Sequence, residues 1–303
     1  MNELDVTHET FYGYRRMVEI GQHLAYLRPQ TLGRQSVLSH VLTIEPEPAH
    51  LSTSMDAFGN ERTFFAFYSP HETLTVTARS RVELLGDRPV DAAASPAHEI
   101  VHDMLRYRAD APFVPEAEFT FPSPMIPLHR EIGDYGRESF TPARPFAEAA
   151  TDLMRRIHRD FVYETASTDV STPLIEAFRG RHGVCQDFAH ILVGALRTLG
   201  FAARYVSGYL LTQPPPGQAR LIGADASHAW ADVWCPVNGW IGLDPTNDCL
   251  VGPSHIVLAI GRDYGDVAPV RGIIRGTSAH TLSVGVTVAP VGEETPDGTS
   301  PRG

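Results

Sequence analysis

The strongest constraint on the fold is an apolar stripe in the middle of the chain. Hydrophobic side chains recur there at the spacing of one helix face, and a glycine closes the run: Phe188, Ile191, Leu192, Ala195, Leu196, Leu199 and Gly200. This pattern predicts a helix with one buried side, and the glycine is typical of a helix C-cap. Because Cys185 lies three residues before Phe188, we expect the thiol at the helix N-terminus, on the buried side.

Two strand-like segments downstream predict a hairpin. In "SHAWADVW", His228 and every second residue after it share one face, and "GWIGLD" follows. If Trp234 pairs with Trp240, His228 becomes the diagonal neighbour of Asp244, about 7–8 Å away at the Cα level. A slip of one residue would put the two on opposite faces. The register therefore requires a loop of three or five residues rather than a two-residue Asn-Gly turn.

The N-terminal part is rich in β-branched residues. Leu74, Val76 and Ala78 alternate with polar residues, which is typical of a half-buried strand, and Gly59-Asn60 indicates a turn. We therefore expect an α+β protein that begins with a β-sandwich-like domain. The expected division is a β-rich domain at 1–90, a Pro-rich connection with a short helix at 91–146, a core at 147–293 and a disordered tail at 294–303.

The overall composition restricts the partners and the compartment. The 303 residues carry a formal net charge of −11, which argues against a nucleic-acid partner. No signal sequence is evident, and the longest apolar runs are too short to cross a bilayer. Three cysteines are too few, and odd in number, for a disulfide framework. These features predict a cytoplasmic protein that binds neither membranes nor nucleic acid.

A cysteine at a helix N-terminus can be a nucleophile, because the unpaired backbone N–H groups favour a thiolate and can hold an oxyanion. It also needs a histidine to move protons and a group that orients the histidine. Taken singly, Cys185 could be an inert buried residue, His228 a packed histidine and Asp244 a turn residue. A zinc site from Cys235, Cys249, His228 and His255 is the weaker alternative, because no CxxC pair is present.

Longer motifs resemble a known family. "GVCQDFAHILVGALRTLGFAARYVSGYL" and "DASHAWADVWCPVNGWIGLDPTND" are similar to the core of the transglutaminase-like superfamily. "THETFYGY", "DAFGNERTFFAF" and "LTVTARSRVEL" resemble the β-rich domain that precedes the core in a bacterial subfamily. The resemblance implies a papain-like fold, with the cysteine-bearing helix packed on an antiparallel sheet. It also implies that Cys185 is the nucleophile, His228 the general base and acid, and Asp244 the orienting carboxylate.

The second oxyanion donor of the family has no obvious counterpart. All three tryptophans follow Cys185, and Arg179 stands where papain-type enzymes have a glutamine. We expect Tyr163 to substitute, since a phenol can donate a hydrogen bond, and Gln186 to help shape the site. Trp230 is either a core residue or a wall of the substrate groove.

The expected activity is cysteine-dependent acyl transfer, which hydrolyses a peptide or amide bond through a thioester, without a cofactor or metal. The partner would be a peptide or protein substrate. One alternative is a protein-glutamine gamma-glutamyltransferase that forms crosslinks, because the same triad serves both reactions. The other is a non-catalytic binding or scaffold protein.

Overall fold

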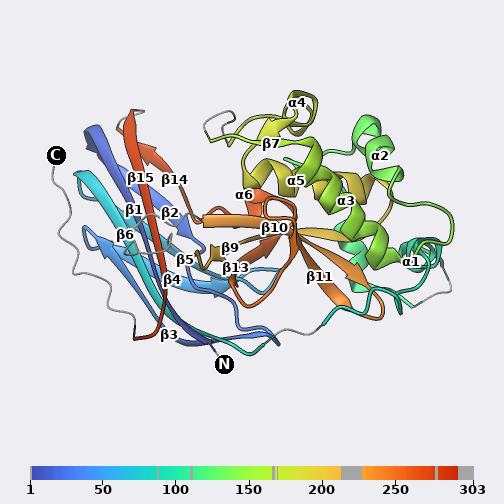
Figure 1. Ribbon diagram of the computed structural model, residues 1–303. Coiled ribbons are helices and arrows are strands. Elements are labelled where there is room, and N and C mark those ends of the chain that lie inside the picture. The colour runs from blue at the N-terminus through green and yellow to red at the C-terminus, as the bar shows by residue number, and fades with distance from the viewer. Residues whose placement is uncertain are drawn as a thin grey trace.

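A computed structural model describes residues 2–86, 89–109, 112–165, 168, 170–212, 227–276 and 279–292. Figure 1 shows a β-sandwich on one side and a sheet covered by helices on the other. The expected α+β class is therefore confirmed, with the β-rich part first in the chain and the helix that begins at Cys185 near the middle of the second part.

The sandwich consists of two four-stranded sheets, ordered β15-β1-β6-β3 and β14-β2-β5-β4. Leu74, Val76 and Ala78 of β6 are buried between them, as the alternation predicts. A turn with Gly59 at φ 80° joins β4 to β5. The strand bounds are β1 Asn2–Val18, β2 Ile20–Ala25, β3 Gln35–Glu45, β4 His50–Met55, β5 Glu61–Phe67, β6 His71–Leu84, β14 Val270–Arg275 and β15 His280–Pro290.

The last two strands correct the expected domain boundary. β14 pairs with β2 and β15 pairs with β1, so both belong to the sandwich rather than to a core at 147–293. The sandwich is therefore assembled from both ends of the chain, and the second domain is inserted between them. The tail expected at 294–303 lies outside the described residues.

The second domain is a five-stranded antiparallel sheet with helices packed against it. Its order is β12-β11-β10-β9-β13, and α5 packs against β9 and β10. The strands are β9 Ala203–Leu210, β10 Ser227–Cys235, β11 Gly239–Asp244, β12 Cys249–Leu250 and β13 His255–Gly261, with a small parallel pair of β7 Val162–Tyr163 and β8 His182–Gly183. The helices are α1 His98–Leu105, η1 Pro115–Thr120, α2 Arg130–Arg137, α3 Phe146–Asp160, α4 Leu174–Gly180, α5 Cys185–Thr198 and α6 Tyr264–Val267.

The short helix expected in the Pro-rich connection is α1, and the same segment also contains η1 and α2. α2 packs against α5 and so belongs structurally to the second domain. Within the described residues, none of the helices combines the length and apolar character needed to cross a bilayer.

Two side-chain amides attach the sandwich to the edge strand β13. The Gln35 amide donates to Val257 O and accepts from Val257 N, both at 2.8 Å. The Asn60 amide does the same with Ile260, at 2.7 and 2.8 Å. Each amide thus replaces the peptide group of a neighbouring strand, so the backbone groups at this edge stay paired. We call Gln35 and Asn60 the edge clamp.

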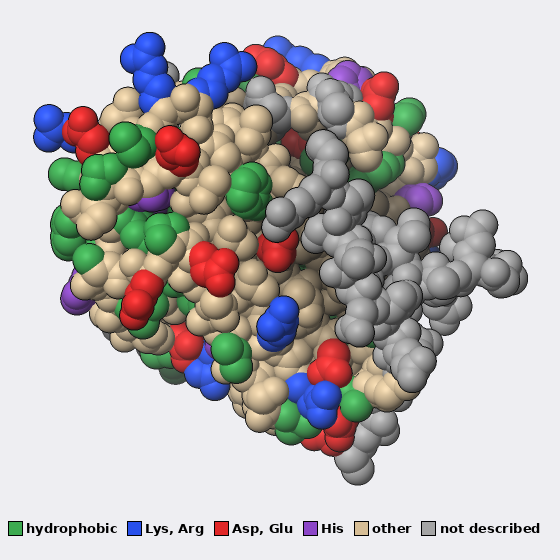
Figure 2. All heavy atoms as spheres, turned by 90° about the vertical axis from the view of Figure 1, so that its left-hand side faces the viewer, with side chains coloured by type: hydrophobic (Ala, Val, Ile, Leu, Met, Phe, Trp, Pro, Cys, Tyr) green, Lys and Arg blue, Asp and Glu red, His purple; other side chains and the backbone are tan. Residues whose placement is uncertain are grey.

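The outer face of the sheet that contains β15, β1 and β6 faces solvent. Exposed apolar side chains on its strands include Val41, Leu282 and Val284. Figure 2 views the molecule from this side and shows hydrophobic side chains interspersed with acidic and basic ones. Apolar side chains scattered in this way are ordinary on a soluble surface.

Candidate active site

The helix that carries Cys185 begins where the sequence predicts. α5 starts at Cys185, and Gly200 follows its last turn at φ 85°. The carboxylate of Asp187 caps the first turn, because Oδ2 accepts from Val184 N at 2.9 Å and from Thr168 Oγ1 at 2.6 Å. The half-buried thiol of Cys185 is thus held at the end of the helix where N–H groups are free to bind an anion.

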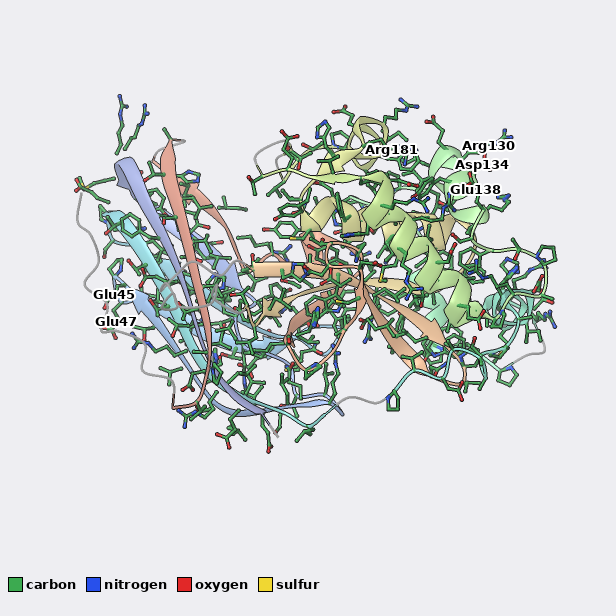
Figure 3. The ribbon with its side chains drawn as sticks, viewed as in Figure 1. Glu45, Glu47, Arg130, Asp134, Glu138 and Arg181 are labelled. Carbon is green, nitrogen blue, oxygen red and sulfur yellow. The ribbon has the colours of Figure 1, made fainter. Side chains whose placement is uncertain are left out.

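The segment before Cys185 is anchored by Arg181. Its backbone is left-handed, with φ 57°, and its guanidinium lies over three rings at 4.9, 4.6 and 4.5 Å: Tyr135, Phe161 and Phe178. Figure 3 shows Arg181 beside α4. Cation–π contacts of this kind fix the guanidinium, and the chain from Arg181 through β8 leads directly into α5.

The hairpin has the register that brings His228 and Asp244 together. Trp234 pairs with Trp240, and three loop residues at 236–238 separate the paired Cys235 and Gly239. Gly239 has φ 70°, a conformation that glycine adopts without strain. The expected pairing and the three-residue loop are both confirmed.

Cys185, His228 and Asp244 come together in one site. His228 Nε2 lies 2.7 Å from Asp244 Oδ2, and Cys185 lies near enough to the His228 ring to help raise its pKa. Because Nε2 is engaged by Asp244, Nδ1 is the nitrogen left for the sulfur. The side chain of His228 is 10% exposed and that of Asp244 is fully buried.

Mutual stabilisation dominates the titration of this pair. Burial alone would lower the pKa of His228, but hydrogen bonds and charge from Asp244 and Cys185 outweigh it and raise the pKa to about 10. Burial would raise the pKa of Asp244, but hydrogen bonds from His228, His255 and Asn247 hold it well below its usual range. The arrangement therefore favours an imidazolium beside a carboxylate at neutral pH.

Two further residues contact the same carboxylate, and sequence reasoning did not assign them. His255 Nε2 lies 3.1 Å from Asp244 Oδ2, and Asn247 Nδ2 donates to this oxygen at 2.7 Å. Asp244 Oδ1 accepts from the backbone N–H groups of Thr246 and Asn247 at 3.0 and 3.2 Å. The signal for Asn247 was its place in "DPTND". For His255 it was a lone histidine at the start of an otherwise apolar strand.

The ligand atoms of His228, Asp244 and His255 lie within 4.8 Å of one another, close enough to consider a metal ion. However, Gly252 N donates to His255 Nδ1 at 3.3 Å, which places the ring proton on Nε2. The Nε2 lone pair is then not available to a metal. This geometry fits a hydrogen-bonded carboxylate better than a metal centre.

The weaker four-residue zinc set is not assembled in the structure. Cys235 is fully buried in the hydrophobic cluster beneath the helices, together with Val233 and Leu243. Cys249 pairs with Asp244 across β11 and β12. Burial and the nearby carboxylates raise the pKa of the Cys249 thiol to about 11, so it remains protonated at neutral pH.

The other three expected site residues lie in different environments. Tyr163 is half-exposed and its ring packs edge-on against Phe188, while burial and the charge of Cys185 raise its pKa. Gln186 is half-buried in the first turn of α5. Trp230 is completely buried and packs against Val206 and its neighbours, so a role as a groove wall is wrong. Its ring instead supports His228 and His255, with ring centroids 6.1 and 5.3 Å away.

Two more tyrosines surround Cys185. Burial and the charge of Cys185 raise the pKa of both Tyr205 and Tyr264. Buried His190 accepts from Tyr264 N at 3.2 Å, and burial lowers its pKa to about 4. As a neutral acceptor, His190 holds the Tyr264 segment, and Tyr264 packs against the same hydrophobic cluster as Cys185.

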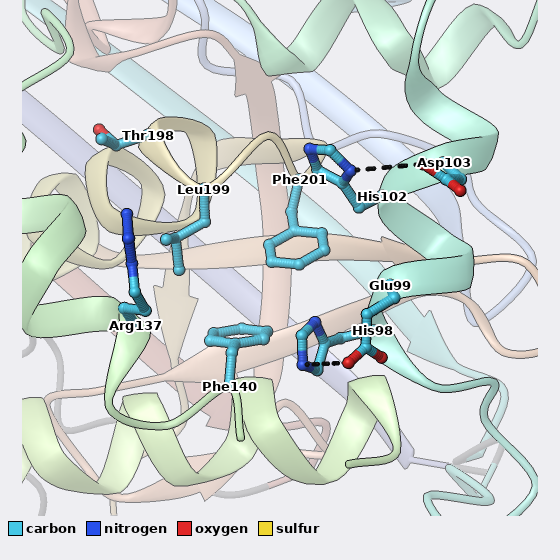
Figure 4. Close-up of a pocket in the computed structure, with 9 residues that line it drawn as sticks. All are labelled: His98, Glu99, His102, Asp103, Arg137, Phe140, Thr198, Leu199 and Phe201. Carbon is cyan, nitrogen blue, oxygen red and sulfur yellow. Dashed lines mark ion pairs between the residues drawn. The ribbon is translucent and has the colours of Figure 1, made fainter. Parts of the chain in front are cut away.

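A separate cavity of about 470 Å³ lies at the other end of α5. Figure 4 shows Phe140 and Phe201 between the charged residues of α1 and Arg137 of α2. Its α5 residue Thr198 is roughly 20 Å along the helix from Cys185 at 1.5 Å per residue. The cavity is therefore remote from Cys185.

Comparison with known proteins identifies the family. Residues 4–83 match the bacterial transglutaminase-like N-terminal region, and residues 134–245 match the transglutaminase-like superfamily. An uncharacterized protein of Mycobacterium tuberculosis is 43% identical over 290 residues, which cover 94% of this chain and 92% of that protein. This chain belongs to the transglutaminase-like superfamily. Its second domain is a transglutaminase-like core, and Cys185 opens the central helix of that core.

Two further relatives define what the transglutaminase-like chain shares with better-described proteins. A proposed cysteine protease from Cytophaga hutchinsonii has the same fold, with a TM-score of 0.70 at 18% identity, over 97% of this chain and 92% of that one. A protein-glutamine gamma-glutamyltransferase of Pseudomonas aeruginosa is 31% identical over 139 residues, which cover 43% of this chain and 20% of that protein.

Proposed function

We propose that this protein is a cysteine-dependent acyl-transfer enzyme that hydrolyses a peptide-like amide bond through a thioester. The observation that carries the proposal is the convergence of Cys185, His228 and Asp244, with His228 hydrogen-bonded to Asp244 and its pKa raised by both neighbours. A nucleophile, a proton carrier and an orienting carboxylate are the three groups that such a reaction requires.

In the first step, the sulfur of Cys185 attacks the carbonyl carbon. His228 gives its proton to the departing amine, the C–N bond breaks, and a thioester remains. The N–H groups at the start of α5 supply oxyanion stabilisation, and Tyr163 is our candidate for a second donor. In the second step, water gives a proton to His228 as its oxygen attacks the thioester, and the acid product leaves with Cys185 restored.

The environment of His228 suits both steps. In the free enzyme, Asp244 and Cys185 together raise the pKa of His228, which keeps the ring protonated and ready to act as an acid. In the thioester the sulfur carries no charge, so its contribution to the pKa disappears. The ring then releases its proton more readily and can act as the base that water requires.

The runner-up activity is transfer of a glutamine acyl group to an amine, which forms crosslinks. The similarity to the Pseudomonas aeruginosa protein-glutamine gamma-glutamyltransferase favours this alternative, although it spans less than half of this chain. Glutamine-containing peptides incubated with methylamine would separate the two. Mass spectrometry would show a methylamide under transfer, and a free acid or a cleaved peptide under hydrolysis.

Labelling with iodoacetamide tests the triad without a known substrate. We expect fast alkylation of Cys185 at neutral pH, because an imidazolium at His228 stabilises the thiolate. His228→Ala should slow this labelling by about tenfold or more, since one charge-assisted hydrogen bond is lost. The buried Cys235 and the protonated Cys249 are internal controls and should label slowly.

The third candidate, a non-catalytic scaffold, predicts a different result. Cys185 would then react like an ordinary thiol, and His228→Ala would leave the rate unchanged. A peptide library free of Cys185-dependent products would also contradict the enzyme proposal, with Cys185→Ala as the matched control.

A further inference from the structure

We propose that His255 is a positioning residue that holds the carboxylate of Asp244 in line with His228. The inference rests on the proposed function and adds a fourth member to its triad. Its basis is the contact between His255 Nε2 and Asp244 Oδ2 at 3.1 Å, deep in the second domain.

The tautomer of His255 follows from its second contact. Gly252 N has a hydrogen to donate and lies 3.3 Å from His255 Nδ1, so Nδ1 is the acceptor and Nε2 carries the proton. His255 therefore donates to Asp244 as a neutral ring. It holds Oδ2 without adding a positive charge that would compete with the imidazolium of His228.

His255 differs from Asn247, another donor to the same oxygen, in being shielded from solvent. Asn247 also donates to Oδ2, but it is exposed, and a water molecule can take its place. His255 is 5% exposed and packs edge-on against buried Trp230, with centroids 5.3 Å apart. Loss of its N–H would remove the buried neutral donor to Oδ2, and would weaken the alignment of this oxygen with His228.

The strand that carries His255 is held by hydrogen bonds from the sandwich. Gln35 and Asn60 of the sandwich bind this edge strand, β13, at Val257 and Ile260, which lie two and five positions after His255. The position of the ring is therefore set by backbone that the sandwich holds in place, rather than by a loop. The site thus depends on the sandwich through a chain of direct contacts.

Two substitutions separate a positioning role from a structural one. In His255→Gln, the amide nitrogen can replace Nε2 and donate to Asp244, while the contact with Gly252 is lost. In His255→Asn, the amide oxygen can replace Nδ1 and accept from Gly252, while the donor to Asp244 is lost. A positioning role predicts that Gln is tolerated and Asn is not, and a structural role predicts the reverse.

The readout is iodoacetamide labelling of Cys185 in the full chain across a pH series. His255→Asn should slow labelling at neutral pH about tenfold and move the pH midpoint of labelling up by about one unit. His255→Gln should stay within about twofold of the wild type. Thermal unfolding of both variants identifies any variant that is not folded.

The outcomes are distinct. A folded His255→Asn variant that labels like the wild type, or a slower rate in Gln than in Asn, overturns the role of His255 while the triad stands. Wild-type labelling that does not depend on His228 overturns both proposals.

Discussion

At the scale of single residues, the site depends on how the neighbours of His228 and Asp244 stabilise the charged forms of these two side chains. The desolvation of His228 is opposed by interactions with Asp244 and Cys185, and that of Asp244 by several donors. Each group thus keeps its charge because the other is present, and an isolated charge at either position would be costly to bury.

This coupling predicts an alkaline limit to activity. Because the pKa of His228 is raised to about 10, the proton needed for the departing amine is present at neutral pH and lost as pH rises through that value. The specificity constant kcat/KM should therefore fall with a one-proton slope in the alkaline range. Asp244→Asn should move this limb toward neutral pH. Burial lowers the pKa of His228, and the charge of Asp244 would no longer offset that effect. An unmoved limb in the pH–rate profile of Asp244→Asn would contradict the assignment.

Gly183 should be intolerant of a side chain, although its backbone has no positive φ. A Cβ there would lie 2.6 Å from Asp187 Oδ2 and 2.8 Å from Asp187 Cβ, so the cap of α5 must move. We expect Gly183→Ala to cost about 1 kcal/mol of stability, the usual effect of a lost cap, and to slow labelling of Cys185. Gly33→Ala is the matched control, since nothing lies within 4 Å of its Cβ. Urea unfolding and labelling of both variants measure the difference, and equal effects would argue against this role of the cap.

At the scale of elements, local pattern determined some features and tertiary context the others. The hairpin register was predictable because Trp234, Trp240 and the period of two leave few alternatives. The strand "HTLSVGVTVAP" contains nothing that says which sheet it joins, so the pairing of β15 with β1 was missed. His255 was missed for a related reason: the contact spans β13 and β11, strands that are not adjacent in the sheet.

Arg197 connects several elements that the apolar stripe alone would not hold. Its side chain is buried, with 2% exposed. The guanidinium donates to Phe119 O of η1, Ala203 O of β9 and Arg262 O just before α6, at 3.0, 2.9 and 2.8 Å. Burial lowers its pKa to about 10, so it stays charged at neutral pH. Its position late in α5 gave no sign of this role.

Removal of this guanidinium should destabilise the second domain. Arg197→Met removes a charged donor from three carbonyls at once, and we expect a loss of roughly 3 kcal/mol in the free energy of unfolding. Arg179→Met is the control, because its ion pair with Glu131 is exposed and should contribute little to stability. Similar losses in urea unfolding of the two variants would show that the buried network contributes little.

At the scale of the whole molecule, the two domains form one structural unit. Leu4 and Val82 of the sandwich share a hydrophobic cluster with Tyr209 and Ile256 of the core, and His8 contacts the Tyr209 hydroxyl at 3.0 Å. The edge clamp adds directed hydrogen bonds to this apolar contact. The sandwich is therefore a supporting part of the site rather than an independent attachment.

The edge clamp predicts hydrogen-exchange rates at individual backbone amides. Val257 N donates to Gln35 and Ile260 N donates to Asn60, so each amide is protected by a different side chain. Gln35→Leu should accelerate hydrogen exchange at Val257, and Asn60→Leu at Ile260, with a stability loss of about 1–3 kcal/mol each. Gln35→Glu keeps an acceptor for Val257 and serves as the milder control. Exchange that rises equally at both amides in each variant would indicate general loosening instead.

The pairing of β15 with β1 also sets an order of events at the ribosome. The first sheet stays incomplete, and the surface of Leu4 and Val6 lacks its partners Val286 and Val288, until translation has passed the entire core. Until then β13, the strand that carries His255, has only part of the apolar surface against which Ile256 and Leu258 pack in the finished fold.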